Sequence, residues 1–127
     1  MAAIENFEDL QVWQLARELS KLVKIITSKG QFVKDFRFSA QISSAAGSCM
    51  DNIAEGFERD GNKEFINFLY IAKGSNGEVR SQAYRALDWA YINEKEYKDI
   101  LDITEKLKFK LQGLINALKN SGGKGYK

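Results

Sequence analysis

Two groups of polar side chains stand at helical spacing in the middle of the sequence. They are Ser48, Asn52 and Glu55 in one predicted helix and Ser75, Glu78 and Gln82 in the next. The carboxylates of Glu55 and Glu78 could share a metal ion or act as a general acid–base pair. They could instead pair with Lys73 and Arg80. No nucleophile, base or phosphate-binding glycine loop accompanies them, so a buried polar network or a contact between subunits is favoured.

Basic side chains are the second group that could do chemistry. From Lys106 to the end of the chain there are six lysines and no acid. The ordinary interpretation is that such lysines compensate the dipole of a helix C-terminus and solvate a tail. The alternative is an anionic partner such as RNA, contacted at its phosphates rather than its bases. The residues expected to bind RNA are Arg80, Arg85, Lys106, Lys108 and Lys110.

The composition excludes several classes of site. Histidine is absent from the 127 residues, which rules out His-dependent triads and zinc sites with imidazole ligands. Cys49 is the single cysteine, so no disulfide can form within the chain, and we interpret it as a small core residue. The net charge of +2 is too small to indicate a nucleic-acid partner by itself.

The same composition bears on location and ligands. No apolar run is long enough to span a membrane, and the N-terminal segment carries acids where a secretory signal would carry basic residues. We therefore expect a cytoplasmic protein with no membrane partner. No residue pattern indicates a cofactor, a metal site or a small-molecule substrate, so no enzymatic activity is expected.

Four amphipathic segments must position these residues, because apolar side chains recur in each at helical spacing. The helices are expected at about 7–28, 39–57, 63–92 and 94–120, with a flexible tail at 121–127. No strand-like alternation is found. Helices of similar length joined by short connections favour an all-α fold, an antiparallel up-and-down four-helix bundle that forms a single domain over 1–127.

Local signals predict where the helices begin and end. Asn6 is expected to cap the first helix, and Gly30 to terminate it. Asn62 is expected to cap the third helix. Asn93 and Glu96 form a capping-box-like pattern at the start of the fourth helix, with Asn in place of Ser or Thr.

The segment between the first two helices, 30–39, has no regular period. We interpret it as a connector with a helical turn around Lys34, and the second helix starts at Ser39 or extends back towards Val33. Three aromatic side chains are expected to cover an end of the core: Phe32, Phe36 and Phe38.

Two glycines lie inside the third predicted helix, Gly74 and Gly77. Each costs about 1 kcal/mol relative to alanine in a helix interior. Such glycines usually persist where a neighbouring backbone comes close. The small-residue face of the second helix is the expected neighbour.

A set of short motifs spans about Phe7 to Leu118. They are Phe7-Glu8-Asp9-Leu10, Val12-Trp13, Ala16, Gln41-Ile42, Ala45-Ala46, Ser48, Asn52-Ile53-Ala54-Glu55-Gly56-Phe57, Phe65, Phe68-Leu69-Tyr70-Ile71-Ala72, Gly74-Ser75 and Glu78. With these motifs the chain resembles the four-helix-bundle proteins of the 23S rRNA-intervening sequence protein family. Those proteins are encoded in intervening sequences of bacterial large-subunit ribosomal RNA genes.

The resemblance implies a small all-helical protein that assembles into a homo-oligomer, a ring-like pentamer, with no established enzymatic activity and with RNA as a candidate partner. The sequence departs from the family pattern at two places. Ser43-Ser44 replaces a basic pair, and Cys49-Met50-Asp51 replaces a segment in which a proline is common. Loss of the basic pair removes two potential phosphate contacts, which weakens the case for RNA binding there.

Three hypotheses follow for the function. The leading one is a non-enzymatic, oligomeric module that binds a macromolecular partner, with RNA as the candidate. The second is a structural or protein–protein interaction module without nucleic-acid binding, and the third is a carboxylate–metal enzyme. The residues expected at helix-packing or subunit contacts are Ser48, Asn52, Glu55, Gly74, Ser75, Gly77 and Glu78.

Overall fold

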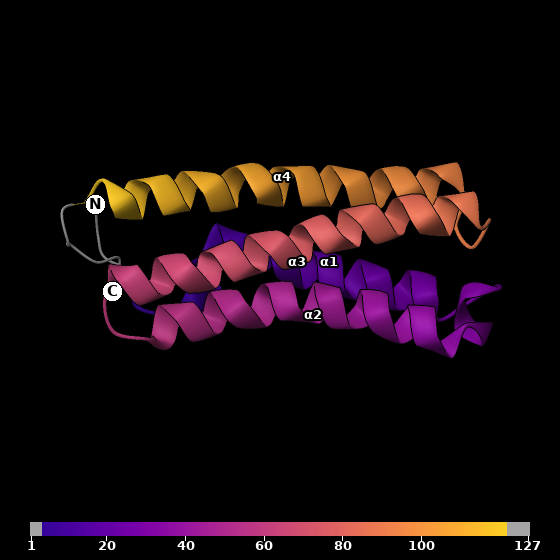
Figure 1. The fold of residues 1–127 in the computed structure, drawn as a ribbon, viewed down its shortest axis with the longest axis horizontal. Coiled ribbons are helices and arrows are strands. Elements are labelled where there is room, and N and C mark those ends of the chain that lie inside the picture. Colours follow the sequence, from indigo (N-terminus) through magenta and orange to yellow (C-terminus); the bar gives the residue numbers. More distant parts are fainter. Residues whose placement is uncertain (1–3, 122–127) are drawn as a thin grey trace.

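The computed structural model describes residues 4–121, and these form four long helices packed side by side (Figure 1). The helices are α1 (Gln11–Thr27), α2 (Phe36–Glu58), α3 (Asn62–Asp88) and α4 (Glu94–Lys119). Each helix contacts the next along the chain, and α1 also contacts α4, which closes the bundle. The connections lie at alternating ends (Figure 1), so the predicted all-α, antiparallel up-and-down four-helix bundle is confirmed.

The core is a cluster of apolar side chains contributed by all four helices. Leu19, Ile53, Leu69 and Leu111, one from each helix, are completely buried. Cys49 is also completely buried among them. Burial raises the pKa of the Cys49 thiol to about 12, because the thiolate would have to form away from water. The expectation that Cys49 is a core residue is confirmed.

The first helix begins later than predicted. Phe7–Asp9 form a separate 3-10 turn, and α1 starts at Gln11 rather than Phe7. The buried residue Leu10 separates the two with an extended backbone. Asn6 makes no side-chain capping bond, so its predicted role is wrong. The apolar side chains explain the break, because Phe7 turns to pack its ring against Trp13, with the ring centroids 5.2 Å apart.

The connector between α1 and α2 contains the expected helical turn, a 3-10 turn at Phe32–Lys34. Helix α2 then begins at Phe36, where Asp35 caps it by accepting a hydrogen bond from the backbone N–H of Phe38 at 3.0 Å. Phe32 and Phe38 are buried as predicted. The prediction for Phe36 is wrong, since this residue is 81% exposed.

Both ends of α3 differ from the prediction. Gly61, with a φ of 81°, occupies the N-cap position, and Asn62 is the first helical residue rather than the cap. The amide of Asn62 instead donates to Ser121 Oγ at 2.7 Å, which ties the start of α3 to the end of α4. At the other end the helix stops at Asp88, because Ala90 turns into the left-handed region with a φ of 59°.

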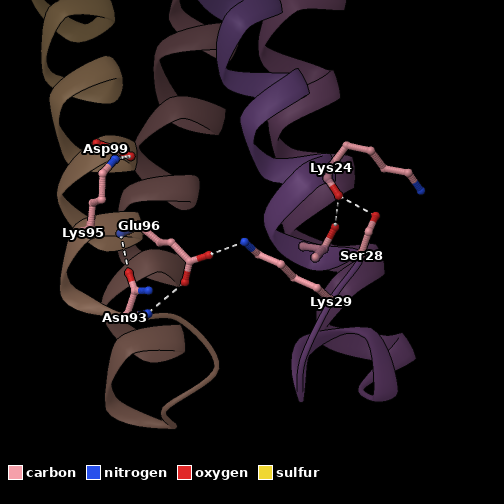
Figure 2. A network of polar contacts seen from close by, with 8 residues as sticks. Lys24, Ser28, Lys29, Asn93, Lys95, Glu96 and Asp99 are labelled. Carbon is pink, nitrogen blue, oxygen red and sulfur yellow. Dashed lines mark hydrogen bonds and ion pairs between the residues drawn. The ribbon is translucent and has the colours of Figure 1, made fainter.

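The start of α4 matches its prediction. Asn93 Oδ1 accepts from the backbone N–H of Glu96, and Glu96 Oε1 accepts in return from the backbone N–H of Asn93. Glu96 also forms an ion pair with Lys29, at 3.0 Å, from the connector after α1 (Figure 2). This pair joins the connector after α1 to the first turn of α4, at the end of the bundle opposite Gly61.

The close helix contact is not where it was predicted. A Cβ atom added to Gly74 or Gly77 would meet nothing within 4 Å, so neither glycine is needed for packing inside the chain. Gly56 on α2 is different, because an added Cβ would lie 2.5 Å from Phe68 Cβ on α3. The tight contact between α2 and α3 is therefore made at the Gly56 end of the two helices.

Candidate functional site

The structure joins part of the predicted polar network between α2 and α3. Ser48 Oγ and Ser75 Oγ are 3.0 Å apart, across the two helices. Asn52 donates from Nδ2 to the hydroxyl of Ser48 at 3.0 Å and to its backbone carbonyl at 2.8 Å. These three partly buried residues satisfy one another, as a structural network does.

The two predicted carboxylates are engaged locally rather than with each other. Glu55 is exposed and forms an ion pair with Arg59, one turn further along α2. Glu78 accepts a hydrogen bond from the side-chain amide of Gln82 at 3.1 Å. Over residues 4–121 no group of three or more potential metal ligands among His, Cys, Asp and Glu is found. The predicted pairing of Lys73 and Arg80 with these acids is also absent from the described ion pairs.

The five cations predicted to bind RNA lie on three different surfaces of the bundle. Arg80 and Lys108 line a cavity between α3 and α4. Arg85 lines a second cavity, between α2 and α3. Lys106 and Lys110 line a groove between α1 and α4. No single patch collects all five.

The α3–α4 cavity concentrates positive charge. It has a volume of about 260 Å³ and is lined by Lys73, Asn76, Gly77, Arg80 and Lys108. Lys73 donates to Gln112 Oε1 at 2.6 Å, while no described ion pair neutralises any of the three cations. Asn76 is buried and donates to the backbone carbonyl of Thr104 at 2.8 Å, and its Oδ1 atom has no protein partner.

The α2–α3 cavity is polar but carries both signs of charge. It has a volume of about 270 Å³ and is lined by Gln41, Glu78, Ser81, Gln82 and Arg85. Two of the residues that line it, Gln82 and Arg85, each have a fully buried side-chain atom that makes no hydrogen bond within the protein. These atoms are the acceptor Gln82 Oε1 and the donor Arg85 Nε.

Aromatic rings hold Arg85 in place at the edge of this cavity. Its guanidinium carbon lies 4.2 Å from the centre of the Phe38 ring and 5.3 Å from that of Trp89. The Phe38 ring also contacts the rings of Phe32, Trp89 and Tyr91. Cation–π contacts therefore orient the arginine, and its charge also helps to lower the pKa of the Asp35 carboxyl.

A partly buried hydrogen bond holds one end of this aromatic cluster in place. Tyr91 donates from its hydroxyl to Asp35 Oδ2 at 2.9 Å. The backbone N–H of Phe38 and this hydroxyl both lower the pKa of the Asp35 carboxyl, because each stabilises its charged form. The same bond raises the pKa of Tyr91.

Sequence reasoning missed Lys73, Asn76 and Trp89 as site residues. Lys73, Asn76 and Arg80 are spaced by three and four positions, which would have placed them on one side of α3. That Lys108 comes from α4 to complete the same cavity could not be read from spacing, because it depends on the register between the two helices. Nothing in the sequence marks Trp89 as half-exposed.

Fold and cavities together define a class: a small up-and-down four-helix bundle with unpaired cations in a cavity between two of its helices. A family model for the 23S rRNA-intervening sequence protein matches residues 8–113, and the chain belongs to this family. No curated protein shows significant sequence similarity to the chain. No helix over the described range 4–121 is long and apolar enough to cross a membrane.

Among solved structures, a protein with the same fold resembles the chain. It is a protein of unknown function from the S23 ribosomal protein family of Bacteroides thetaiotaomicron, and it superimposes with a TM-score of 0.76. The two chains are 24% identical, over 83% of this chain and 95% of the other. At this identity the likeness supports the bundle and its connectivity.

Proposed function

We propose that this protein is a non-enzymatic, oligomeric module of the cytoplasm that binds RNA through the phosphate backbone. The observation that carries the proposal is the α3–α4 cavity, where Lys73, Arg80 and Lys108 face one small space with no acid paired to them. Three like charges around one cavity repel one another, and an anion placed among them removes that repulsion. A phosphate group is the anion that RNA supplies at every nucleotide.

Neighbouring lysines extend this surface over the outer side of α4. Lys106 and Lys110 lie on the α1 side of the helix and Lys108 on the α3 side, and all three are exposed. A strand crossing α4 would therefore meet cations on both sides. On α2, by contrast, Ser43 and Ser44 supply no charge, so we place the RNA contact on α3 and α4.

Titration of labelled ribosomal RNA fragments at several salt concentrations tests the proposal. The triple variant Lys73→Gln, Arg80→Gln and Lys108→Gln should bind more weakly, and its slope of log K against log salt should fall by about 2 to 3. The matched control is Arg17→Gln, Lys21→Gln and Lys24→Gln, which removes the same charge from α1. Equal losses in the two variants, or no RNA binding at low salt, would contradict the proposal.

A protein partner is the second candidate, and two exposed aromatic side chains favour it. Phe36 is 81% exposed and Phe109 is 67% exposed. Phe109 borders an apolar groove of about 590 Å³ between α1 and α4, together with Ile4, Leu10 and Leu114. Exposed apolar surface of this kind is typical of contacts between proteins.

Assembly with copies of itself is the partner that the family resemblance favours, and we propose a homo-oligomer of five subunits. Native mass spectrometry at micromolar concentration gives the subunit number directly. A pentamer is expected. A monomer at that concentration would contradict the oligomeric part of the proposal and leave the RNA part to its own test.

A further inference from the structure

We infer that the groove between α1 and α4 binds the exposed Phe36 side chain of a second copy of this chain. The inference rests on the oligomeric part of the proposed function and deepens it, because it names the two surfaces that meet in the assembly. The groove lies where α1 begins and α4 ends, whereas Phe36 begins α2 at the other end of the bundle (Figure 1). The two copies therefore join head to tail.

An open glycine in the groove is the first observation. Gly113 lies inside α4, where a glycine weakens the helix relative to alanine. A Cβ atom added to it would meet nothing within 4 Å, so packing inside the chain does not require a glycine there. Phe109 lies one turn earlier on the same face of α4 and is 67% exposed. The chain thus leaves apolar space beside Gly113 that a side chain from outside can fill.

The Phe36 side chain is suited to that space. It is 81% exposed, more than any other large apolar residue in the described range 4–121. Val33, three residues earlier, is also exposed and extends the apolar surface. Aromatic side chains that enter a pocket on the partner are the usual anchors of protein interfaces. The groove, at about 590 Å³, has room for such a ring.

Charge complementarity favours a second copy of this chain as the occupant. Two exposed cations, Lys34 and Arg37, lie on either side of the anchor ring in the sequence. At the groove Asp9 is one of the lining residues, and the same N-terminal segment carries Glu5 and Glu8, all three exposed. None of these five side chains takes part in the ion pairs of the described residues. Head-to-tail contact brings the cations of one copy to the acids of the next.

The residues of opposite sign at each surface are already engaged. Asp35, beside the anchor ring, accepts hydrogen bonds from the backbone N–H of Phe38 and the hydroxyl of Tyr91. Lys110, in the groove, donates to Gln11 Oε1 at 2.9 Å. The surface around the anchor therefore stays positive, and the surface around the groove stays negative.

A contact between two different surfaces suits assembly into a ring. Each copy presents the anchor at one end and the groove at the other, so every copy binds two neighbours. Such a contact closes into a ring or continues as an open filament, whereas an interface between identical surfaces joins copies in pairs. An odd number of subunits, as in the proposed pentamer, requires a contact of the first kind.

Two variants that each remove one side of the contact test the inference. Phe36→Ser removes the anchor, and Gly113→Leu fills the groove with a side chain whose Cβ meets no neighbour within the chain. Native mass spectrometry at micromolar concentration should show a monomer for each variant alone. An equimolar mixture should form a dimer with one chain of each kind, because one variant keeps the groove and the other keeps the anchor. A mixture that stays monomeric would contradict the docking of Phe36 in the groove.

Matched controls make the same kinds of change elsewhere. Ile71→Ser removes an exposed apolar side chain from α3, and Gly74→Leu adds a leucine at another open glycine of that helix. Both controls should assemble as the wild type does. Circular dichroism should show full helix content in all four variants, because every substituted position is exposed.

The remaining outcomes separate this inference from the proposed function. Pentamers in both Phe36→Ser and Gly113→Leu overturn the inference alone, and leave the groove to a different protein or to the chain's own terminal residues. Loss of assembly in Gly74→Leu but not in Gly113→Leu places the contact on α3, which overturns the inference and keeps the oligomer. A wild-type chain that is itself a monomer overturns the oligomeric part of the proposed function.

Discussion

Gly56 on α2 and Gly77 on α3 are both glycines inside long helices, yet their surroundings are opposite. At Gly56 an added Cβ would come within 2.5 Å of Phe68 Cβ and 3.2 Å of a Phe65 ring carbon. At Gly77 an added Cβ would touch nothing within 4 Å, and the residue borders the cation-lined cavity instead. The first glycine is required by the bundle, whereas the second is not.

The difference shows which part of α3 serves the fold and which part is free for a partner. Near its start, α3 is pressed against α2 by Phe65 and Phe68. Around Gly77, small residues leave the helix backbone open to the surface, at a cost in helix propensity that the chain's own packing does not recover. An incoming phosphate or a second subunit could make use of that opening.

The largest expected effect is at the crowded glycine. Gly56→Ala should lower the free energy of unfolding by about 1 to 3 kcal/mol, because the new methyl group must displace α2 from Phe68. Urea denaturation measures this loss. An unchanged midpoint would mean that the two helices separate easily there, and the comparison with Gly77 would lose its basis.

The open glycines should behave in the opposite way. Gly74→Ala and Gly77→Ala should each raise the free energy of unfolding by about 0.5 to 1 kcal/mol, since alanine favours the helix and meets no neighbour. The same denaturation experiment applies. A variant that is less stable, or that fails to assemble, would indicate that a second subunit packs against that glycine.

Beside the open glycines, helices α2 and α3 are also joined by the hydrogen bond between Ser48 and Ser75. Ser75→Ala removes the partner of Ser48 but leaves Asn52 bonded to that hydroxyl. We therefore expect a loss of only about 0.5 kcal/mol. Ser81→Ala, at an exposed position of the same helix, is the control in the thermal melts and should lose nothing. A loss as large as that at Gly56 would contradict the distinction.

The smallest effect is expected at Asp35, the N-cap residue of α2, and it depends on pH. Because hydrogen bonds from Phe38 and Tyr91 lower the pKa of Asp35, its contribution to stability is present above the ordinary pKa of 3.8 and is lost as the pH falls through the lowered value. Asp35→Asn should flatten the thermal stability profile below about pH 4 relative to the wild type. Asp102→Asn, on α4, should keep the wild-type slope.

Periodicity predicted the number, order and type of the helices, because each amphipathic stripe is a local property of the chain. The helix ends were less accessible. Leu10 and Phe7 leave the helical path in order to reach the core, and Ala90 ends α3 with a left-handed residue that is not a glycine. Tertiary contacts determine both helix ends, and local capping patterns in the sequence carry no information about such contacts.

The candidate sites were predicted in part. Arg80, Arg85 and Lys108 were identified by charge, and all three line cavities. Their separation onto two sides of α3 depends on how the helices are rotated about their axes. The same rotation buries Gln82 and leaves Trp89 half-exposed, so the α2–α3 cavity required the structure.

The buried thiol of Cys49 can report how often the bundle opens. It is the only thiol in the sequence, it is completely buried, and its raised pKa makes it unreactive while the helices remain packed. An alkylating reagent can therefore modify it only during a transient opening of α2. Mass spectrometry can follow the addition of one label, and the rate of this reaction measures how often α2 opens. The rate can be compared with and without a partner that stabilises the closed bundle.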